Sequence, residues 1–294
     1  MIVFPEISPE VFSFAVAGFS FSVRWYALAY IAGFLIGWKI GVAAIRRPHV
    51  WLYNSPPLSA SDFEKLVSWL ILGVIIGGRL GYVLFYKPAY FLSNPLEIVM
   101  VWKGGMAFHG GFLGVVVAAY LFFRRNNIPI GSGADLLALC TPVGLLLGRL
   151  ANFINGELWG RPTDLPWGVV FPSQAAQACG KITDICARHP SQLYEAILEG
   201  IILGGLLLYF AFIKGYLKKR WFITGAFLTG YGISRSFVEI FRQPDPQFQT
   251  ASNPIGYVVH WESFGLTMGQ ILSIPMMLIG IFLIYLAFKN AKYG

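Results

Sequence analysis

Residues 66–86 read LVSWLILGVIIGGRLGYVLFY, a run of 21 residues in which Arg79 is the single charged side chain. A helix needs about 20 predominantly apolar residues to cross the hydrocarbon core of a bilayer. The run also spaces Gly73, Gly77 and Gly81 four residues apart, which lets two membrane helices approach closely. This stretch therefore predicts a membrane-spanning helix.

The composition of the whole chain agrees with that prediction. Of its 294 residues, 56% are hydrophobic and 12% are charged, and the mean hydropathy is +0.63. A soluble domain carries about 25% charged residues. These values exclude a disordered chain, a coiled coil and an ordinary soluble enzyme. The net charge of +8 is not gathered in a basic tail, so we expect no nucleic-acid partner.

Six further apolar runs have the length of a membrane span. The seven predicted spans are 20–43, 66–86, 108–124, 134–151, 195–213, 221–241 and 266–288. We therefore predict an all-α integral membrane protein, with residues 1–294 forming a single polytopic domain of about seven helices. No Lys or Arg precedes Arg24, so a cleavable signal peptide is not expected.

The basic residues between the spans predict the orientation. One side carries eleven of them in short connections and the tail: Lys39, Arg46, Arg47, Arg124, Arg125, Lys214, Lys218, Lys219, Arg220, Lys289 and Lys292. The other side has Lys87, Lys103, Arg161, Lys181, Arg188 and Arg242, spread through longer segments. The positive-inside rule then places the N-terminus outside and the C-terminus in the cytoplasm.

The longest outer connection, about 152–194, is rich in Pro, Gly and polar residues and predicts a small extracytoplasmic cap. It contains Cys179 and Cys186. On the oxidising side of a membrane the two thiols can pair, and two unpaired thiols fit the sequence equally well. Cys140 falls within a span, where we expect it to pack. Further Gly-x3-Gly pairs, such as Gly110 with Gly114 and Gly144 with Gly148, predict close helix contacts.

Ionisable residues inside the spans are the strongest indication of function, because burying charge in a membrane is costly. The set comprises Arg24, Arg79, His109, Arg149, Glu195, Glu199, Arg235 and Glu239. Counting along the helices places most of them in the outer half of the bilayer. Snorkelling to the interface can explain Arg24 and Arg149, but it explains the deeper Arg79 and Arg235 poorly. We therefore predict a shared, outward-facing and cationic cavity, with Arg161 and Arg242 just above it.

The chemistry of such a cavity points to an anionic ligand. Guanidinium groups bind phosphate oxygens in pairs, so a phospholipid head group is a natural occupant. His109 has the pKa range of a general acid or base, although a histidine at a helix end often serves structure alone. Motifs for a zinc protease, a serine nucleophile elbow and a phosphate-binding loop are absent, as is metal-ligand spacing. We expect no metal or cofactor, and a nucleophile supplied by a substrate.

One segment carries a specific resemblance. Residues 148–162 read GRLANFINGELWGRP, and TDLPWGVVFP follows to residue 172. This segment resembles the signature of the prolipoprotein diacylglyceryl transferases. Six others resemble the family in the same order: VRWYALAYIAG (23–33), GGRLGYVLFY (77–86), AFHGGFLG (107–114), HPSQLYEA (189–196), GYGISRSFVEIFRQPD (230–245) and LTMGQILSIPM (266–276).

The resemblance implies a seven-span enzyme of the bacterial inner membrane whose active site faces the periplasm. Such an enzyme transfers diacylglycerol from phosphatidylglycerol to the lipobox cysteine of a preprolipoprotein signal peptide, which is the first step of lipoprotein maturation. The family's functional residues fall here on Tyr26, His109, Arg149, Asn152, Glu157, Gly160, Tyr231, Arg235 and Glu239. No departure from the family pattern occurs at these positions.

Roles for these residues follow as a hypothesis. Arg149 and Arg235 would bind the phosphate, assisted by Arg79 or Arg161. His109 would handle the thiol proton. Tyr26 and Tyr231 would position the head group or the peptide, and Asn152, Asn155 and Glu157 would hold glycerol hydroxyls or arginine side chains. The alternative for each polar residue is a hydrogen bond that pins two helices together.

Two other classes of protein remain open at this stage. A transporter or flippase for an anionic lipid would also have an arginine-lined cavity, but it should carry polar residues through the cytoplasmic half as well. That half is nearly free of them, which favours an enzyme. A non-catalytic membrane chaperone would not need His109 at the mouth of a cavity.

Overall fold

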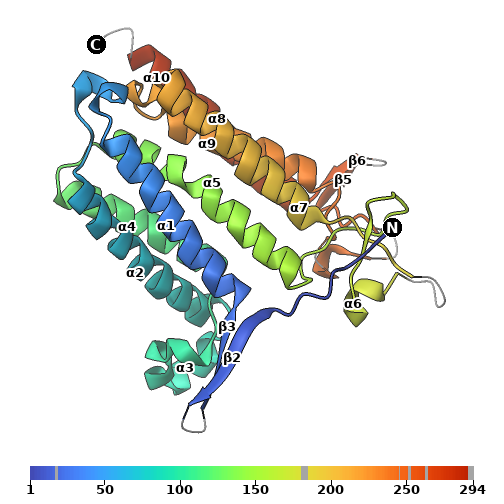
Figure 1. Cartoon of the computed structure of the whole chain (residues 1–294). Helices are drawn as coiled ribbons and strands as arrows, with labels where there is room; N and C mark the ends of the chain where they lie inside the picture. The colour runs from blue at the N-terminus through green and yellow to red at the C-terminus, as the bar shows by residue number, and fades with distance from the viewer. Residues whose placement is uncertain (17–18, 180–184, 245, 251–252, 262–263, 291–294) are drawn as a thin grey trace.

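The structure, a computed structural model, describes residues 1–16, 19–179, 185–244, 246–250, 253–261 and 264–290. Long apolar helices lie side by side in a bundle, with small strands and loops at one end (Figure 1). The main helices are α1 (Trp25–Ile45), α2 (Ala60–Phe85), α4 (Phe108–Arg125), α5 (Ile130–Ile154), α9 (Phe222–Val238) and α10 (Met268–Asn290). Between α5 and α9, one continuous helical run comprises α7 (Ser191–Glu195), the π-helix η5 (Ala196–Ile202), α8 (Leu203–Leu208) and the π-helix η6 (Tyr209–Ile213).

Within the described residues, five helices are long and apolar enough to cross a membrane. They are Trp25–Ile45, Ala60–Phe85, Ile130–Ile154, Ser191–Ile213 and Met268–Asn290. The other two predicted spans fall on α4 and α9, which are shorter at 18 and 17 residues. The chain is therefore an all-α, multi-pass membrane protein in its main body.

Helix α5 lies at the centre of the bundle. It packs against α1 on one side and against η5 and α9 on the other, while α2 pairs with α4 and α9 pairs with α10 (Figure 1). The glycine spacing predicted close contacts, and the α2–α4 pair confirms them. A side chain at Gly114 would overlap the carbonyl oxygen of Gly73, and a Cβ at Gly81 would lie 2.8 Å from Gly110 Cα.

The first predicted span began too early. Residues 19–24 belong to strand β3 (Phe19–Arg24), which pairs antiparallel with β2 (Glu10–Val16), and the helix starts at Trp25. The segment FSFSVR alternates apolar and polar residues, a pattern of period two that is typical of a strand. Hydropathy averaged over a long window does not separate such a strand from the helix that follows it.

The predicted cap is built from more of the chain than 152–194. Strand β1 (Ile2–Val3) pairs in parallel with β4 (Val169–Val170), and Phe4 packs with Phe171 in a small buried core. A disulfide joins Cys179 and Cys186, so the pairing left open by the sequence is present. The buried Arg188 side chain stacks on Trp159, with its guanidinium carbon 3.9 Å from the ring centre. The N-terminal segment is therefore a structural part of the cap.

Short elements complete the chain. They are η1 (Pro48–Val50), η2 (Leu52–Asn54), α3 (Pro88–Ser93), η3 (Pro95–Val99), η4 (Val101–Lys103), α6 (Gln174–Gln177), η7 (Tyr216–Lys218), η8 (Pro246–Phe248), β5 (Val259–Trp261) and β6 (Phe264–Leu266). Strands β5 and β6 pair antiparallel just before α10. The backbone of Gly160 forms a bridge with Arg242, which ties the cap to the segment after α9.

Candidate functional site

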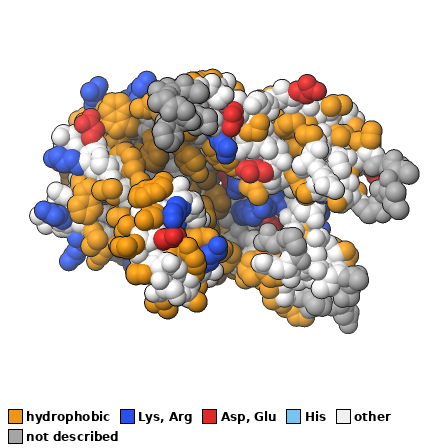
Figure 2. All heavy atoms as spheres, turned by 90° about the horizontal axis from the view of Figure 1, so that it is seen from below, with side chains coloured by type: hydrophobic (Ala, Val, Ile, Leu, Met, Phe, Trp, Pro, Cys, Tyr) orange, Lys and Arg blue, Asp and Glu red, His pale blue; other side chains and the backbone are white. Residues whose placement is uncertain are grey.

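A cavity of about 520 Å³ lies among α1, α2, α4 and α5. Figure 2 shows a hollow in a largely apolar face, with basic and acidic side chains gathered inside it. Most of the cavity wall is apolar. Polar side chains line it where α1 begins and α5 ends, namely Tyr26, Arg149, Asn152 and, from α9, Tyr231. The cavity thus has a polar end and a long apolar body.

At the polar end, Tyr26, Asn152 and Glu157 form a hydrogen-bonded triangle. The Tyr26 hydroxyl donates to the Glu157 carboxylate and accepts from the Asn152 amide, and Asn152 Nδ2 also donates to Glu157 Oε1 at 2.9 Å. The three residues come from the first turn of α1, the last turn of α5 and the loop after α5. The triangle therefore fixes the start of α1 against the end of α5, and it brings together three of the residues that the family resemblance named.

Behind Arg149 lies a buried cluster of ion pairs centred on Glu195. Glu195 Oε2 is 3.2 Å from Arg149 Nε, and Glu195 Oε1 is 2.6 Å from Arg235 Nη1 and 3.0 Å from Arg242 Nη1. Glu199 lies one turn further along, 3.9 Å from Arg149 Nε, within the π-helix η5. Both glutamate side chains are fully buried. Removing one partner from such a pair leaves an uncompensated buried charge, so each member holds the others in place.

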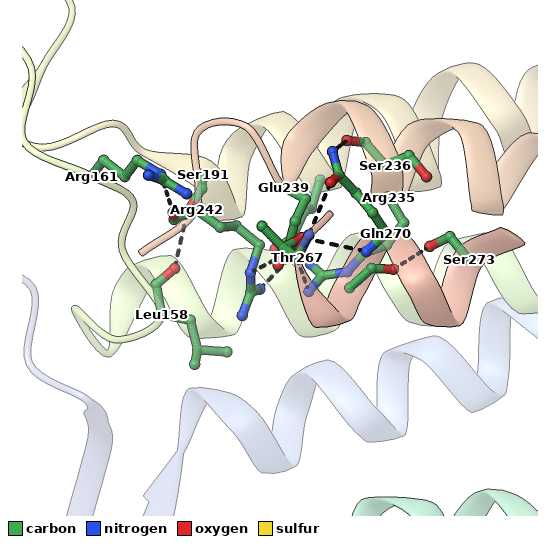
Figure 3. Close-up of polar contacts among 12 residues, drawn as sticks. Leu158, Arg161, Ser191, Arg235, Ser236, Glu239, Arg242, Thr267, Gln270 and Ser273 are labelled. Carbon is green, nitrogen blue, oxygen red and sulfur yellow. Dashed lines mark hydrogen bonds and ion pairs between the residues drawn. The ribbon is translucent and has the colours of Figure 1, made fainter. Parts of the chain in front are cut away.

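Glu239 extends this cluster along α9. Its Oε2 lies 2.9 Å from Arg235 Nη2 and 3.6 Å from Arg242 Nε, so it sits between the two arginines (Figure 3). A Cβ at Gly269 of α10 would meet the Glu239 carboxyl group at 2.5 Å, which shows how closely α10 packs there. Both terminal nitrogens of Arg235 are therefore engaged with carboxylates. Its expected contact with phosphate is replaced here by contacts with Glu195 and Glu239.

The cluster is not strongly cationic as a whole, which corrects the sequence-based expectation. Three arginines (Arg149, Arg235, Arg242) face three glutamates (Glu195, Glu199, Glu239). The positive and negative side chains differ in their exposure to the cavity, however. The Arg149 side chain is 18% exposed and lines the cavity, whereas Glu195 and Glu199 are fully buried behind it. The charge presented to the cavity is therefore positive.

The shortest contacts of Arg149 with its two carboxylates are made through Nε. Within the part of the chain that the structure describes, its two terminal amino groups form no hydrogen bond. A guanidinium group that is held at Nε and open at its fork has the geometry that binds phosphate or carboxylate oxygens in pairs. Arg149 thus places a guanidinium group with this geometry at the polar end of the cavity.

Arg79 does not join this cluster. Its side chain donates to the backbone carbonyl oxygens of the loop before α4, at Glu97 (2.5 Å), Ile98 (2.8 Å), Gly104 and Gly105 (3.2 Å). The residue is 4% exposed. The predicted place of Arg79 in a shared cavity is wrong, because α2 turns this side chain toward the loop at residues 95–105 rather than toward α5.

The structure places the remaining predicted residues around the site with different contacts. His109 is exposed on the first turn of α4, beside Phe108, which lines the cavity. Gly160 lies in the cap, where a Cβ would overlap the Phe241 carbonyl oxygen. Arg161 donates to the carbonyl oxygens of Arg242 (2.8 Å) and Ile255 (3.1 Å). Asn155 caps the end of α5, with Oδ1 buried and without a partner among the described residues.

The sequence did not identify two features of the site. Glu195 was counted among the charges inside the spans, yet its central place in the cluster depends on contacts between three helical segments. The other feature is the pair Gly144 and Gly148, which we expected to pack against a helix. A Cβ at either position would meet nothing within 4 Å, and both residues line the cavity. The glycine pair beside the GRLANF segment was the one indication in the sequence. Glycine spacing alone does not distinguish a helix-packing surface from the wall of a cavity.

The fold and the site define a multi-pass helical membrane protein with an arginine side chain at the polar end of a largely apolar cavity. The model of the prolipoprotein diacylglyceryl transferase family matches residues 13–286, and the chain belongs to this family. It is 59% identical over 281 residues to the phosphatidylglycerol–prolipoprotein diacylglyceryl transferase of Ruegeria pomeroyi, covering 96% of this chain and 95% of that protein. It is similar to proteins of the same name from Roseobacter denitrificans (57% over 283 residues, 96% of each chain) and Rhizobium meliloti (45% over 282 residues, 96% and 92%).

Proposed function

We propose that this protein transfers the diacylglyceryl group of phosphatidylglycerol to the lipobox cysteine of a prolipoprotein. Family membership and the names of its relatives support the reaction. The observation that carries it at the level of residues is the open fork of Arg149 at the polar end of an apolar cavity. A lipid with an anionic head group has the same division into a charged end and apolar chains.

The cavity suits one lipid lying along α1 and α5. Its lining follows α1 from Tyr26 to Trp38 and α5 from Leu137 to Asn152. At 1.5 Å per residue these stretches are about 20 Å long, comparable with an extended acyl chain. The head group would meet Arg149, Tyr26 and Asn152. Gly144 and Gly148, which leave open space in the wall, would give the acyl chain room.

We place seven helices across the inner membrane, with α4 and α9 as the two short spans and the N-terminus in the periplasm. The basic pairs Arg46–Arg47 and Arg124–Arg125 support this orientation, because they follow α1 and end α4 at the same end of the bundle. The polar end of the cavity and the disulfide-bonded cap lie at the other end. The disulfide agrees with an oxidising compartment on that side.

The reaction forms one bond and breaks one. The thiol of the lipobox cysteine loses its proton, and the sulfur attacks the glycerol carbon that carries the phosphate. The carbon–oxygen bond breaks, its electron pair leaves with the oxygen, and glycerol phosphate is released. A thiol of pKa about 8.5 is mostly protonated at neutral pH, so a proton acceptor assists. We assign this role to His109, which is exposed beside the cavity-lining Phe108.

The arginine cluster stabilises the leaving group. Negative charge grows on the phosphate as the carbon–oxygen bond breaks, and fixed donors in a water-poor site stabilise such charge well. Arg149 supplies the direct contact. Glu195 contacts Arg149 at Nε, and Arg235 and Arg242 in turn contact Glu195. These three residues are therefore positioning residues. Tyr231 reaches the same wall of the cavity from α9.

Reconstitution tests the proposal. The full-length protein is placed in vesicles of phosphatidylglycerol with a signal peptide that contains a lipobox cysteine, and thioether product and glycerol phosphate are measured. Both should appear in equal amounts, and a peptide with serine in place of the cysteine should give neither. Absence of both products with the cysteine peptide would overturn the proposed reaction.

The role of His109 has a separate test. His109→Gln should lower turnover most near neutral pH, where an ordinary imidazole can accept a proton while most of the thiol is still protonated. The effect should be smaller above pH 8.5, where more thiolate forms without help. The Tm should not change, because the side chain is exposed. A turnover equal to that of the unchanged protein across this pH range would retire the assignment and leave the reaction itself intact.

A further inference from the structure

A second cavity, of about 240 Å³, lies at the opposite end of the bundle from the arginine cluster. It is formed by the loop that links α1 to α2, the start of α5 and the residue just before α9. The lining comprises Trp51, Leu52, Tyr53, Ser55, Pro56, Pro57, Pro129, Ser132 and Arg220. Ser132 and Asn152 are 20 residues apart on α5, which separates the two sites by about 30 Å. The proposed transfer reaction uses none of these residues.

The start of α5 provides hydrogen-bond donors in this cavity. The N-cap residue is Pro129, and no side chain caps the helix there. The first amides of a helix have no partners within the helix, and the helix dipole adds a partial positive charge at this end. Since α5 has 25 residues, its dipole is fully developed. A helix start of this kind favours an anion.

The side chain of Ser132 is a second and independent indication of a ligand. The residue is 7% exposed and lines the cavity. Across the described residues no hydrogen-bond partner is found for its hydroxyl group. The hydroxyl oxygen is not fully enclosed by the protein, so it can be reached from the cavity and can donate to a ligand there.

Arg220 adds the formal charge. Arg220 lines the cavity from the α9 side and is exposed, so its guanidinium group can contact a ligand in the cavity. The nearest carboxylate on α5, Asp135, is occupied elsewhere. It accepts from the backbone of Trp221 (2.7 Å) and Thr224 (2.8 Å) and from the Thr224 hydroxyl (2.7 Å), and so caps α9. Both of its carboxylate oxygens are thereby occupied by donors at the start of α9.

From these three observations we propose that the second cavity binds a phosphate group, between the start of α5, the Ser132 hydroxyl and the Arg220 guanidinium. The phosphate belongs either to an anionic phospholipid head group or to a free phosphate ion. Other basic residues at this end of the bundle, Arg46, Arg47 and Lys219, attract both. The site would fasten the α1–α2 loop to α5 and α9, and it is independent of the transfer reaction.

The test compares the full-length protein with a double variant, Ser132→Ala with Arg220→Gln, and with Lys218→Gln as the matched control. Lys218 is exposed, lies two residues from Arg220 and does not line the cavity. Inorganic phosphate is titrated in zwitterionic detergent at constant ionic strength, and the rise in Tm gives an apparent affinity. In a second arm, native mass spectrometry counts the phosphatidic acid molecules retained after dilution from mixed micelles.

We expect the double variant to lose affinity for one or both probes by about tenfold or more, with the control unchanged. A loss confined to phosphatidic acid identifies a lipid head group as the occupant, and a loss for inorganic phosphate identifies the free ion. Equal Tm values without anion show that the variant is folded, and Ser132→Asp, which places a carboxylate in the cavity, provides a second variant. Identical binding of both probes by all proteins, or no binding by the unchanged protein, would overturn the site.

Discussion

The same three residues, Gly-Arg-Leu, occur at 78–80 in α2 and at 148–150 in α5, and the structure uses them in different ways. Arg79 is surrounded by neutral backbone carbonyl oxygens, which occupy its Nε and both terminal nitrogens. Arg149 has its shortest carboxylate contacts at Nε and lines a cavity, and its terminal nitrogens form no hydrogen bond within the described residues. A buried arginine becomes a binding group where the fold leaves part of it unoccupied.

The glycines of the two regions differ in the same way. Gly73 and Gly114 bring α2 and α4 into contact, so that no side chain fits between them. Gly144 and Gly148 carry the same spacing but face open space. The α2–α4 region is therefore closed packing, and the wall formed by α5 is an open surface for a ligand. The predictions below test this contrast.

The largest effect is expected for Arg149→Lys. Lysine keeps the positive charge but cannot present two parallel donors to a phosphate. Because loss of one donor to developing charge typically costs about 10²–10³-fold in rate, we expect turnover to fall by about that amount. The Tm should change little, since the side chain is partly exposed. Turnover is measured as thioether product in phosphatidylglycerol vesicles, and turnover within threefold of the unchanged protein would remove Arg149 from the catalytic set.

Arg79→Lys should show the reverse pattern. A lysine cannot reach four carbonyl oxygens at once, so some of them lose their partners. Since an unsatisfied buried polar group costs about 1–3 kcal/mol, we expect a destabilisation of about 3 kcal/mol and a clear fall in Tm. Turnover per folded molecule should stay close to that of the unchanged protein. A loss of turnover at unchanged Tm would instead mean that Arg79 contacts the substrate, as the sequence-based hypothesis held.

Arg79 and Arg149 also show which features of the structure can be predicted from the sequence and which cannot. Lipid requires long apolar helices, so hydropathy located each main helix to within a few residues, and the charges inside them indicated a site. Residue counting places Arg79 along α2 but does not give the rotation of the helix, and rotation decides which neighbour a side chain contacts. Glu195 escaped assignment for the same reason, because its three arginine partners come from α5, α9 and the segment after α9. The hairpin before α1 was missed because short strands carry little hydropathy signal.

Gly144→Val tests the open wall and should have a smaller effect. A Cβ at this position meets nothing within 4 Å, so the Tm should be nearly unchanged. The added methyl groups occupy space that the acyl chain needs. We expect the KM for phosphatidylglycerol to rise about tenfold, which corresponds to about 1.4 kcal/mol, with a modest change in kcat.

Gly114→Ala is the matched control, because a single methyl group there would overlap the Gly73 carbonyl oxygen. It should lower the Tm with little change in KM. If the two variants gave the same result, the distinction between closed packing and an open wall would fail.

The smallest effect concerns the surface of the loop that Arg79 holds. Lys103 donates to Glu97 at 2.8 Å, and this contact, together with the Tyr90 hydroxyl, keeps the pKa of Glu97 below its usual range. A lowered carboxylate pKa stabilises the fold above the unfolded-state pKa of about 4.3, and this contribution is lost as the pH falls through the lowered value. Lys103→Gln should therefore reduce Tm slightly at pH 7, and the difference should shrink as the pH falls below the unfolded-state pKa of about 4.3. Because the pair is exposed, this reduction should be much smaller than that of Arg79→Lys. An equal or larger reduction would mean that the ion pair, rather than the four carbonyl contacts of Arg79, holds the loop against α2.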